Sequence, residues 1–194
     1  MKRSDKIVLF VIVALFATAA GSFVSVQRET RVAAGNAAKA AAEAFYTQRL
    51  ADATGVERSM GEHRGKVVVV NFWATWCVPC VEEIPTFSRV HAEHAGQVAF
   101  VGLGIDSASN IASFNTRFKP SYPLLVAGAG GTELARAFGD GAGALPFTVV
   151  LGPDGRIVAS RLGRVDEATL QKWIAPFVAQ PKAATVPNPT ATPS

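Results

Sequence analysis

The chain has 194 residues, of which 49% are hydrophobic and 18% charged, and it carries a formal net charge of +4. This composition provides for one folded domain of ordinary size plus appendages, and such a domain needs no disulfide framework to fold. The basic residues are scattered, with no run of five or more like charges, so we expect no nucleic-acid partner.

The first element is an uncharged stretch of twenty residues at positions 7–26. A helix of that length spans a hydrocarbon core of about 30 Å. Three basic residues and one acidic residue precede it, which favours a cytoplasmic N-terminus at residues 1–6. The pattern predicts a single-pass anchor in the cytoplasmic membrane, with the domain on the periplasmic or extracytoplasmic side. The alternative is a signal peptide cleaved after the small residues at 17–19, which leaves a soluble periplasmic protein. Both place the cysteines in an oxidising compartment.

Residues 27–44 are rich in alanine with interspersed charges, and they predict a helical or semi-flexible stalk that buries little. The folded domain is expected at 45–180 and begins with a short hairpin that turns at DATG, residues 52–55. Residues 181–194 are mainly proline, threonine and alanine, which predicts a disordered tail.

Strands and helices alternate through the domain. A continuous β-branched apolar run at 67–73 predicts a strand buried on both faces, and a helix is expected from Cys77 to Gly96 with Pro85 inside it. The order implies parallel pairing and a final antiparallel hairpin, so we predict an α/β fold with a central mixed β-sheet flanked by helices. The later expected elements are strands at 97–105, 123–128, 146–151 and 156–163 and helices at 107–118, 131–139 and 166–179.

The only two cysteines, Cys77 and Cys80, lie where the first buried strand turns into the next helix. Free backbone N–H groups and the helix dipole stabilise a thiolate at Cys77, and Cys80 lies one helical turn on, within reach of it. A disulfide that closes so short a loop adds little stability, so the pair favours redox chemistry. A zinc site would need two more ligands, and His91 and His94 lie toward the far end of the helix, so we expect no metal.

The segment VVVVNFWATWCVPCVEEIPTF resembles the TlpA/ResA-like membrane-anchored thiol–disulfide oxidoreductases of the thioredoxin superfamily. The resemblance covers about residues 45–179 and implies a thioredoxin-like fold, with the N-terminal transmembrane helix as the family's anchor. It implies an enzyme without a cofactor, whose attacking thiol is Cys77, whose resolving thiol is Cys80, and whose redox disulfide joins the two. Trp76 and Pro79 match the tryptophan and proline of the motif and support the active site.

Three further positions carry the resemblance. Pro146 matches the family's cis-proline, which lies against the disulfide, and the backbone of Leu145 would pair with a bound substrate strand. Glu83 matches a glutamate three residues after the second cysteine, where it would raise the thiol pKa values and accept the proton of Cys80. The alternative for Glu83 is an exposed helix residue, as we expect for Glu82.

The resemblance implies an exported reductase of disulfide-bearing proteins, such as apocytochrome c or copper-site assembly proteins, with a membrane protein as electron donor. The uncharged dipeptide Val78–Pro79 offers no cation to a thiolate and Glu83 would oppose one, which favours a reductant. The alternatives are an oxidase or isomerase for secreted proteins, and a non-enzymatic assembly module that holds Cu(I) through the two thiolates.

Overall fold

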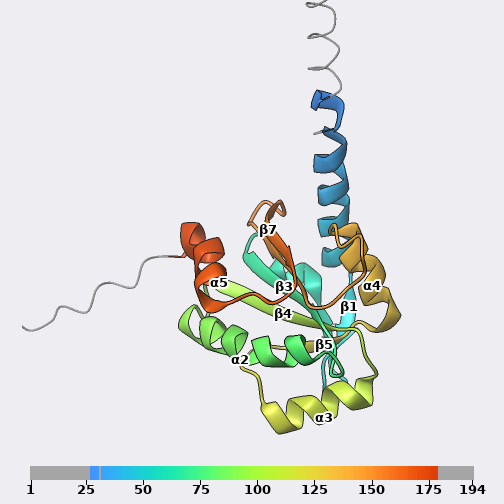
Figure 1. The fold of residues 1–194 in the computed structure, drawn as a ribbon, viewed down its shortest axis with the longest axis vertical. Helices are drawn as coiled ribbons and strands as arrows, with labels where there is room; N and C mark the ends of the chain where they lie inside the picture. The colour runs from blue at the N-terminus through green and yellow to red at the C-terminus, as the bar shows by residue number, and fades with distance from the viewer. Residues whose placement is uncertain (1–26, 31, 179–194) are drawn as a thin grey trace, which may run out of the picture.

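The computed structural model of the protein describes residues 27–30 and 32–178 (Figure 1). The predicted anchor at 7–26, the residues before it and the predicted tail at 181–194 lie outside this range. Within the described part of the chain, no helix combines the length and the apolar character that crossing a membrane requires.

A five-stranded mixed sheet with the order β5–β4–β3–β6–β7 forms the centre of the domain. Three parallel strands make up one side: β3 (Val67–Trp73), β4 (Val98–Gly104) and β5 (Leu124–Val126). On the other side of β3, β6 (Phe147–Leu151) runs antiparallel to it and β7 (Ile157–Leu162) runs antiparallel to β6. The predicted mixed, mainly parallel sheet with a closing hairpin is therefore confirmed.

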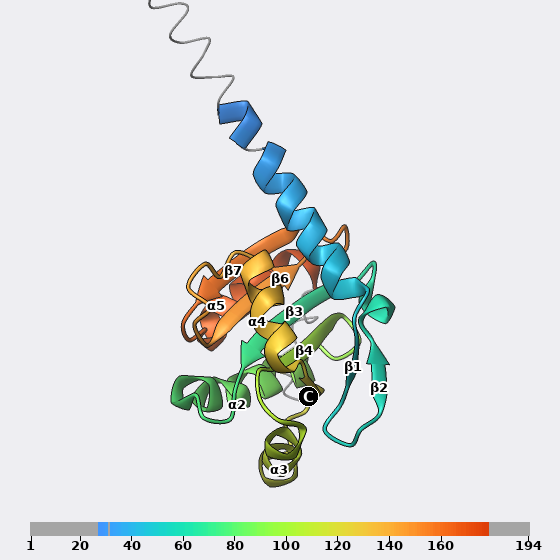
Figure 2. The same cartoon turned by 90° about the vertical axis from the view of Figure 1, so that its right-hand side faces the viewer.

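Four helices connect or follow these strands in the predicted order. They are α2 (Val78–Glu93), α3 (Ala108–Phe118), α4 (Gly128–Ala137) and α5 (Glu167–Ile174), and a 3-10 turn, η2 (Ala175–Phe177), extends the last one. Helices α2 and α5 lie on one side of the sheet in Figure 1, whereas α4 lies on the other, beside the N-terminal helix. Figure 2 shows α4 and the N-terminal helix together in front of the strands.

The alternation of side chains along β3 fills both cores. Val67, Val69 and Trp73 belong to the core under α2, α3 and α5. The residues between them, Val68, Val70 and Phe72, belong to the core under α4 and the N-terminal helix. All seven residues of β3 are buried, as expected for a central strand covered on both faces.

The N-terminal helix is part of the domain and not only a stalk. Residues 32–46 are helical, and Ala41, Ala42, Phe45 and Tyr46 are buried in the second core. The expectation that the alanine-rich segment buries little is wrong at Ala41 and Ala42, because alanine lets the helix approach the sheet closely. The expected boundary between residues 44 and 45 therefore falls within a continuous helix.

Two glycines of β4 let α3 and β5 approach this strand. A Cβ atom on Gly102 would lie 2.5 Å from Leu124 Cδ2, and one on Gly104 would collide with Ile111 of α3. Both glycines are needed here for close packing and not for an unusual backbone conformation. They set α3 against the end of the sheet where the cysteines lie.

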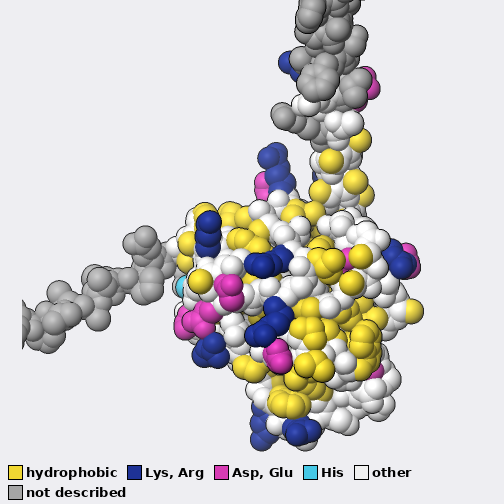
Figure 3. Space-filling view, in the orientation of Figure 1, with side chains coloured by type: hydrophobic (Ala, Val, Ile, Leu, Met, Phe, Trp, Pro, Cys, Tyr) yellow, Lys and Arg dark blue, Asp and Glu magenta, His cyan; other side chains and the backbone are white. Residues whose placement is uncertain are grey.

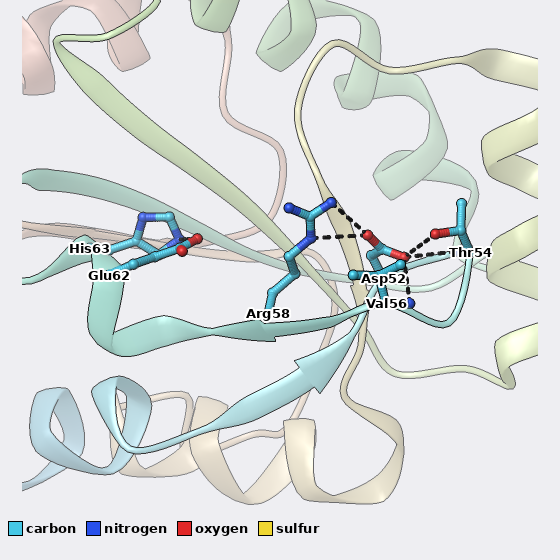
Figure 4. A network of polar contacts seen from close by, with 6 residues as sticks. All are labelled: Asp52, Thr54, Val56, Arg58, Glu62 and His63. Atoms are coloured by element: carbon cyan, nitrogen blue, oxygen red, sulfur yellow. Dashed lines mark hydrogen bonds and ion pairs between the residues drawn. The ribbon is translucent and has the colours of Figure 1, made fainter.

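The predicted N-terminal hairpin consists of β1 (Arg49–Ala51) and β2 (Glu57–Ser59), followed by a 3-10 turn, η1 (Met60–His63). Asp52 organises its turn (Figure 4): Oδ1 accepts hydrogen bonds from the Thr54 N–H at 2.9 Å and the Val56 N–H at 3.1 Å. The other oxygen, Oδ2, accepts from Arg58 Nε at 3.0 Å. Asp52 also bridges to Leu125 of β5, which joins the hairpin to the edge of the sheet.

Replacing Asp52 should loosen this hairpin. We expect Asp52→Ala to lower the free energy of unfolding by about 1–2 kcal/mol in urea titrations at pH 7. Hydrogen bonds lower the pKa of Asp52 from 3.8 to about 2, and the bond from the Thr54 side chain has the largest effect. The contribution is therefore complete above pH 3.8 and is lost as the pH falls through about 2. The control is Glu57→Ala, which removes an exposed ion pair with Arg49 and should change little. Equal effects of the two substitutions would contradict this account.

Candidate active site

The two cysteines lie at the junction between β3 and α2. Cys77 is the N-cap residue of α2, and its Sγ accepts a hydrogen bond from the backbone N–H of Cys80 at 3.3 Å. The two residues form a disulfide with their Cα atoms 5.2 Å apart. Pro79 occupies the first turn of the helix, where its missing N–H leaves no bond unmade. The sequence prediction of a cysteine pair at a strand-to-helix turn is confirmed.

Both cysteines are buried, but the residues on either side of Cys77 are exposed. Cys80 is fully buried and Cys77 is 6% exposed, whereas the flanking residues Trp76 and Val78 are 68% and 67% exposed. Large apolar side chains are normally buried in a soluble domain, so two neighbouring exposed ones point to a contact surface. An incoming molecule would meet Cys77 between these two side chains.

Asp106 holds the turn before Cys77, and sequence reasoning missed it. Its Oδ2 accepts hydrogen bonds from the Thr75 hydroxyl and, at 3.1 Å, from the Thr75 N–H. Its Oδ1 accepts from Asn110 Nδ2 and from the Ser107 N–H, both at 2.7 Å. Although burial opposes ionisation, these bonds together lower the pKa of Asp106 below its usual value. Its position in the sequence could have indicated this role. Asp106 follows β4, and the parallel neighbour β3 ends at the same edge of the sheet, just before the cysteines.

The loop before β6 supplies the third part of the site. The peptide bond between Leu145 and Pro146 is cis, as the resemblance implies. The Pro146 carbonyl accepts a hydrogen bond from the Gly163 N–H at 2.7 Å, which ties this loop to the end of β7. Pro146 is buried and Leu145 is half-buried, and Leu145 packs against both cores. Since β6 is antiparallel to β3, its first residues lie at the edge of the sheet where β3 ends.

Glu83 is buried, and the alternative of an exposed helix residue is wrong for it. Its Oε1 accepts a hydrogen bond from Asn71 Nδ2 at 2.8 Å, and its Oε2 accepts from the Val165 N–H at 3.1 Å. Burial raises the pKa of Glu83 from 4.5 to about 7, although the hydrogen bonds from Val165 and Asn71 act in the opposite direction. Its neighbour Glu82 is exposed, as expected, and pairs with Arg164 at 2.7 Å.

The core around Glu83 holds further polar atoms. Asn71 Nδ2 also donates to Thr148 Oγ1 at 3.1 Å, while Asn71 Oδ1 has no hydrogen-bond partner in the described structure. Tyr122 belongs to the same core; burial, with the Glu83 charge as a second cause, raises its pKa above the ordinary value. Glu83 lies three residues after Cys80 on α2, so both residues share one side of the helix. The carboxyl group of Glu83 therefore lies one helical turn from Cys80, on the same side of α2.

The described residues contain no group of three or more histidine, cysteine or acidic side chains arranged to hold a metal ion. The expectation that the protein uses no metal and no cofactor remains a prediction.

Comparison with known proteins supplies the family. A profile described as Redoxin matches residues 33–173. The chain belongs to this family. It is 32% identical over 77 residues to the thioredoxin-like protein YneN of Bacillus subtilis, and 29% identical over 111 residues to the thiol–disulfide oxidoreductase ResA of Geobacillus thermodenitrificans. The matches cover 38% and 56% of this chain. They span only 45% and 61% of the length of the two relatives.

Solved structures show the same fold. A DsbF homologue from Corynebacterium diphtheriae superposes with a TM-score of 0.59 at 29% identity, and the alignment covers 66% of this chain and 83% of that one. The predicted thioredoxin-like α/β fold and the resemblance to the ResA/TlpA-like branch of the thioredoxin superfamily are therefore confirmed. ResA is described as a thiol–disulfide oxidoreductase, and this chain carries a disulfide between Cys77 and Cys80; the same activity for this chain remains a prediction.

The raised pKa of Glu83 predicts how stability depends on pH. Between pH 4.5 and about 7 the native state keeps a proton that the unfolded chain releases. The contribution of this group is therefore complete below pH 4.5 and is lost as the pH rises through about 7, with a slope of at most about 1.4 kcal/mol per pH unit. Urea titrations of the oxidised protein across this range measure the slope.

Glu83→Gln should remove the part of the pH dependence of the unfolding free energy that comes from Glu83. The glutamine carbonyl can still accept from the Val165 N–H, and its amide can donate to Asn71 Oδ1 once the asparagine amide turns over. The matched control is Glu82→Gln, which changes an exposed carboxylate on the same helix and should retain the full slope. A Glu83→Gln protein with the wild-type slope would show that Glu83 is not the group that titrates.

Proposed function

We propose that this protein is an exported, membrane-anchored thiol–disulfide oxidoreductase that reduces disulfide bonds in partner proteins. The observation that carries the proposal is the Cys77–Cys80 disulfide at the start of α2, in which Cys77 is 6% exposed and Cys80 is fully buried. Such a bond adds little to stability because it closes a very short loop. Its position at a helix N-terminus suits a thiolate that attacks other disulfides.

The reaction starts from the reduced protein. The Cys77 thiolate attacks one sulfur of the partner's disulfide, the partner's S–S bond breaks, and its other sulfur leaves as a thiolate that takes up a proton. Cys77 and the partner are then joined by a mixed disulfide. The Cys80 thiol gives its proton to Glu83 and attacks Cys77 Sγ, and the partner's second sulfur leaves and is protonated. The products are a partner dithiol and the Cys77–Cys80 disulfide.

Glu83 acts as the general base in the second step. A carboxyl group with a pKa of about 7 can accept a proton near neutral pH. It can release that proton to water at the same pH before the next cycle. Trp76, Pro79, Leu145 and Pro146 take no part in electron transfer: they shape the surface on which the partner lies, and the Leu145 backbone pairs with an extended partner segment.

A reducing direction follows from the charges near the pair. Strong oxidants owe their potential to a stabilised thiolate in the reduced form. Here the residues between the cysteines are Val78 and Pro79, which carry no charge, and the buried carboxyl of Glu83 lies on the same helix. A negative charge at Glu83 disfavours a second negative charge on sulfur, so the thiolate is stabilised less than the helix N-terminus alone would allow, and the pair is a better reductant.

The cellular setting rests on the N-terminal sequence and on the relatives. Residues 7–26 would anchor the chain in the cytoplasmic membrane with the domain outside the cytoplasm. In that oxidising space the pair needs an electron donor, and we propose a membrane protein that receives electrons from cytoplasmic thioredoxin. We propose apocytochrome c or a copper-site assembly protein as the disulfide-bearing substrate.

The midpoint potential of the Cys77–Cys80 pair tests the direction. We expect a value near or below about −220 mV for the full chain equilibrated with thiol buffers of known potential. A value above about −150 mV would overturn the reductase proposal and support an oxidase or isomerase of secreted proteins instead.

The order of the two cysteines is tested by trapping. We expect Cys80→Ser to accumulate a mixed disulfide with a substrate protein, visible on non-reducing gels, because the resolving thiol is missing. Cys77→Ser should form none, because the remaining thiol is buried. In the wild-type background, Glu83→Gln should slow release of the partner by about 10²-fold or more at pH 7. Trapping by Cys77→Ser in place of Cys80→Ser would reverse the assignment.

A further inference from the structure

A surface groove of about 400 Å³ lies beside the cysteine turn, between α2 and α3. Thr75 lines it two residues before Cys77, and Val81 lines it directly after Cys80. Figure 3 shows hydrophobic side chains in the lower part of the domain, above the position of α3 in Figure 1, with basic side chains at the lower edge of the molecule. The opposite side of the groove is formed by α3, which contributes Asn110, Phe114, Arg117 and Phe118.

A row of three aromatic rings extends from the core to the surface, and the outer two, Phe114 and Phe118, line the groove. Trp73 is buried at the end of β3, and its ring centroid lies 4.8 Å from that of Phe114. Phe114 in turn stacks on Phe118, with centroids 4.3 Å apart and planes inclined by 30°. Phe118 is 47% exposed, although it continues the apolar stripe that its helix buries at Ile111 and Phe114.

Arg117 adds a positive charge to this apolar surface. Its guanidinium carbon lies 5.0 Å from the centre of the Phe118 ring, so the side chain is stacked on the aromatic and not extended freely into water. Seven other arginines form ion pairs with carboxylates, whereas Arg117 forms none within the described residues. A stacked guanidinium still presents its N–H groups at its edge, where it can bind a carboxylate in a bidentate manner.

The groove is held in place by the same carboxylate that holds the cysteine turn. Asp106 accepts hydrogen bonds from Thr75 on one wall of the groove and from Asn110 on the other. The distance between the turn and α3 is therefore fixed, and the groove is formed without a ligand. Preformed surfaces bind extended segments with less loss of conformational entropy.

We propose that this groove binds the segment of a substrate protein that flanks its reactive cysteine, and that it prefers an apolar side chain followed by a carboxylate. The apolar side chain packs on Phe118 and the carboxylate pairs with Arg117. The inference rests on the proposed function, in which a substrate sulfur is joined to Cys77, because Thr75 and Val81 of the groove lie within two residues of Cys77 and Cys80 in sequence. An extended chain advances about 3.3 Å per residue, so the recognised side chains lie within the first few residues after the cysteine.

The test uses two disulfide-bonded peptides of the same apolar sequence, one with glutamate and one with lysine two to four residues after the cysteine. Single-turnover rates are measured with the full chain, reduced beforehand, at low ionic strength. We expect the glutamate peptide to react about tenfold faster, and 0.5 M NaCl to diminish the difference. Equal rates of the two peptides with the wild-type protein would overturn the proposal.

Two variants locate the preference, and each has a matched control. Arg117→Glu should reverse the order of the two peptides, whereas Arg156→Glu, an exposed arginine in the β6–β7 turn, should leave it unchanged. Phe118→Ser should raise the concentration of either peptide that gives half the maximal single-turnover rate, with little change in the maximal rate itself, whereas Phe177→Ser, which changes an exposed phenylalanine of η2, should not. An unchanged peptide preference in Arg117→Glu, or equal effects of Arg117→Glu and Arg156→Glu, would contradict the assignment.

A small neutral disulfide separates this inference from the proposed function. Reduction of hydroxyethyl disulfide needs Cys77 but no groove, so Arg117→Glu and Phe118→Ser should react with it at the wild-type rate. If the wild-type protein reduces hydroxyethyl disulfide but shows no peptide preference, the groove proposal fails and the proposed function stands. If the wild-type protein reduces neither, both fail.

Discussion

The hydrogen bond between Asn71 and Glu83 joins the central strand to the helix that carries both cysteines. Asn71 Nδ2 donates to Glu83 Oε1 over 2.8 Å within the core. The second carboxylate oxygen, Oε2, accepts from the Val165 N–H just before α5. Two apolar residues of similar size would pack in the same space without the free-energy cost of burying a carboxyl group. Burial raises the pKa of this carboxyl group to about 7, and two N–H donors hold it one turn from Cys80; the proposed proton transfer rests on this arrangement.

The strand order determines which segments meet at this edge of the sheet. Because β3 lies between the parallel strand β4 and the antiparallel strand β6, its end is adjacent to the end of β4 and to the start of β6. Cys77 follows the first strand, Asp106 follows the second, and Pro146 precedes the third. The site is thus assembled from three segments far apart in sequence. Its chemistry depends on a sheet topology that keeps their ends together.

The fold could be predicted from the sequence because its pattern is strong. The apolar run of β3, the alternation of strands and helices, and the closing hairpin fix the order of elements, and two cysteines at a strand-to-helix turn identify the site. The rotation of α2 relative to Asn71 and Val165 determines whether Glu82 or Glu83 is buried. Both partners lie far from Glu83 in sequence, so the residues around it do not reveal which glutamate they bind. The same holds for Asp106, whose role depends on the adjacency of β3 and β4. Ala41 and Ala42 were misjudged because alanine has high helix propensity both in the core and in solvent.

The end of α3 is equally informative. Ile111, Phe114 and Phe118 form one stripe in sequence, but the core ends at Phe114, so the last ring lies at the surface beside the redox site. A solitary exposed aromatic would be unremarkable. This one stacks on a buried ring, supports an arginine, and borders a groove whose two walls are held by Asp106. Since Asp106 also fixes the turn before Cys77, a substrate held in the groove has a defined position relative to the attacking sulfur, which is the condition for efficient exchange.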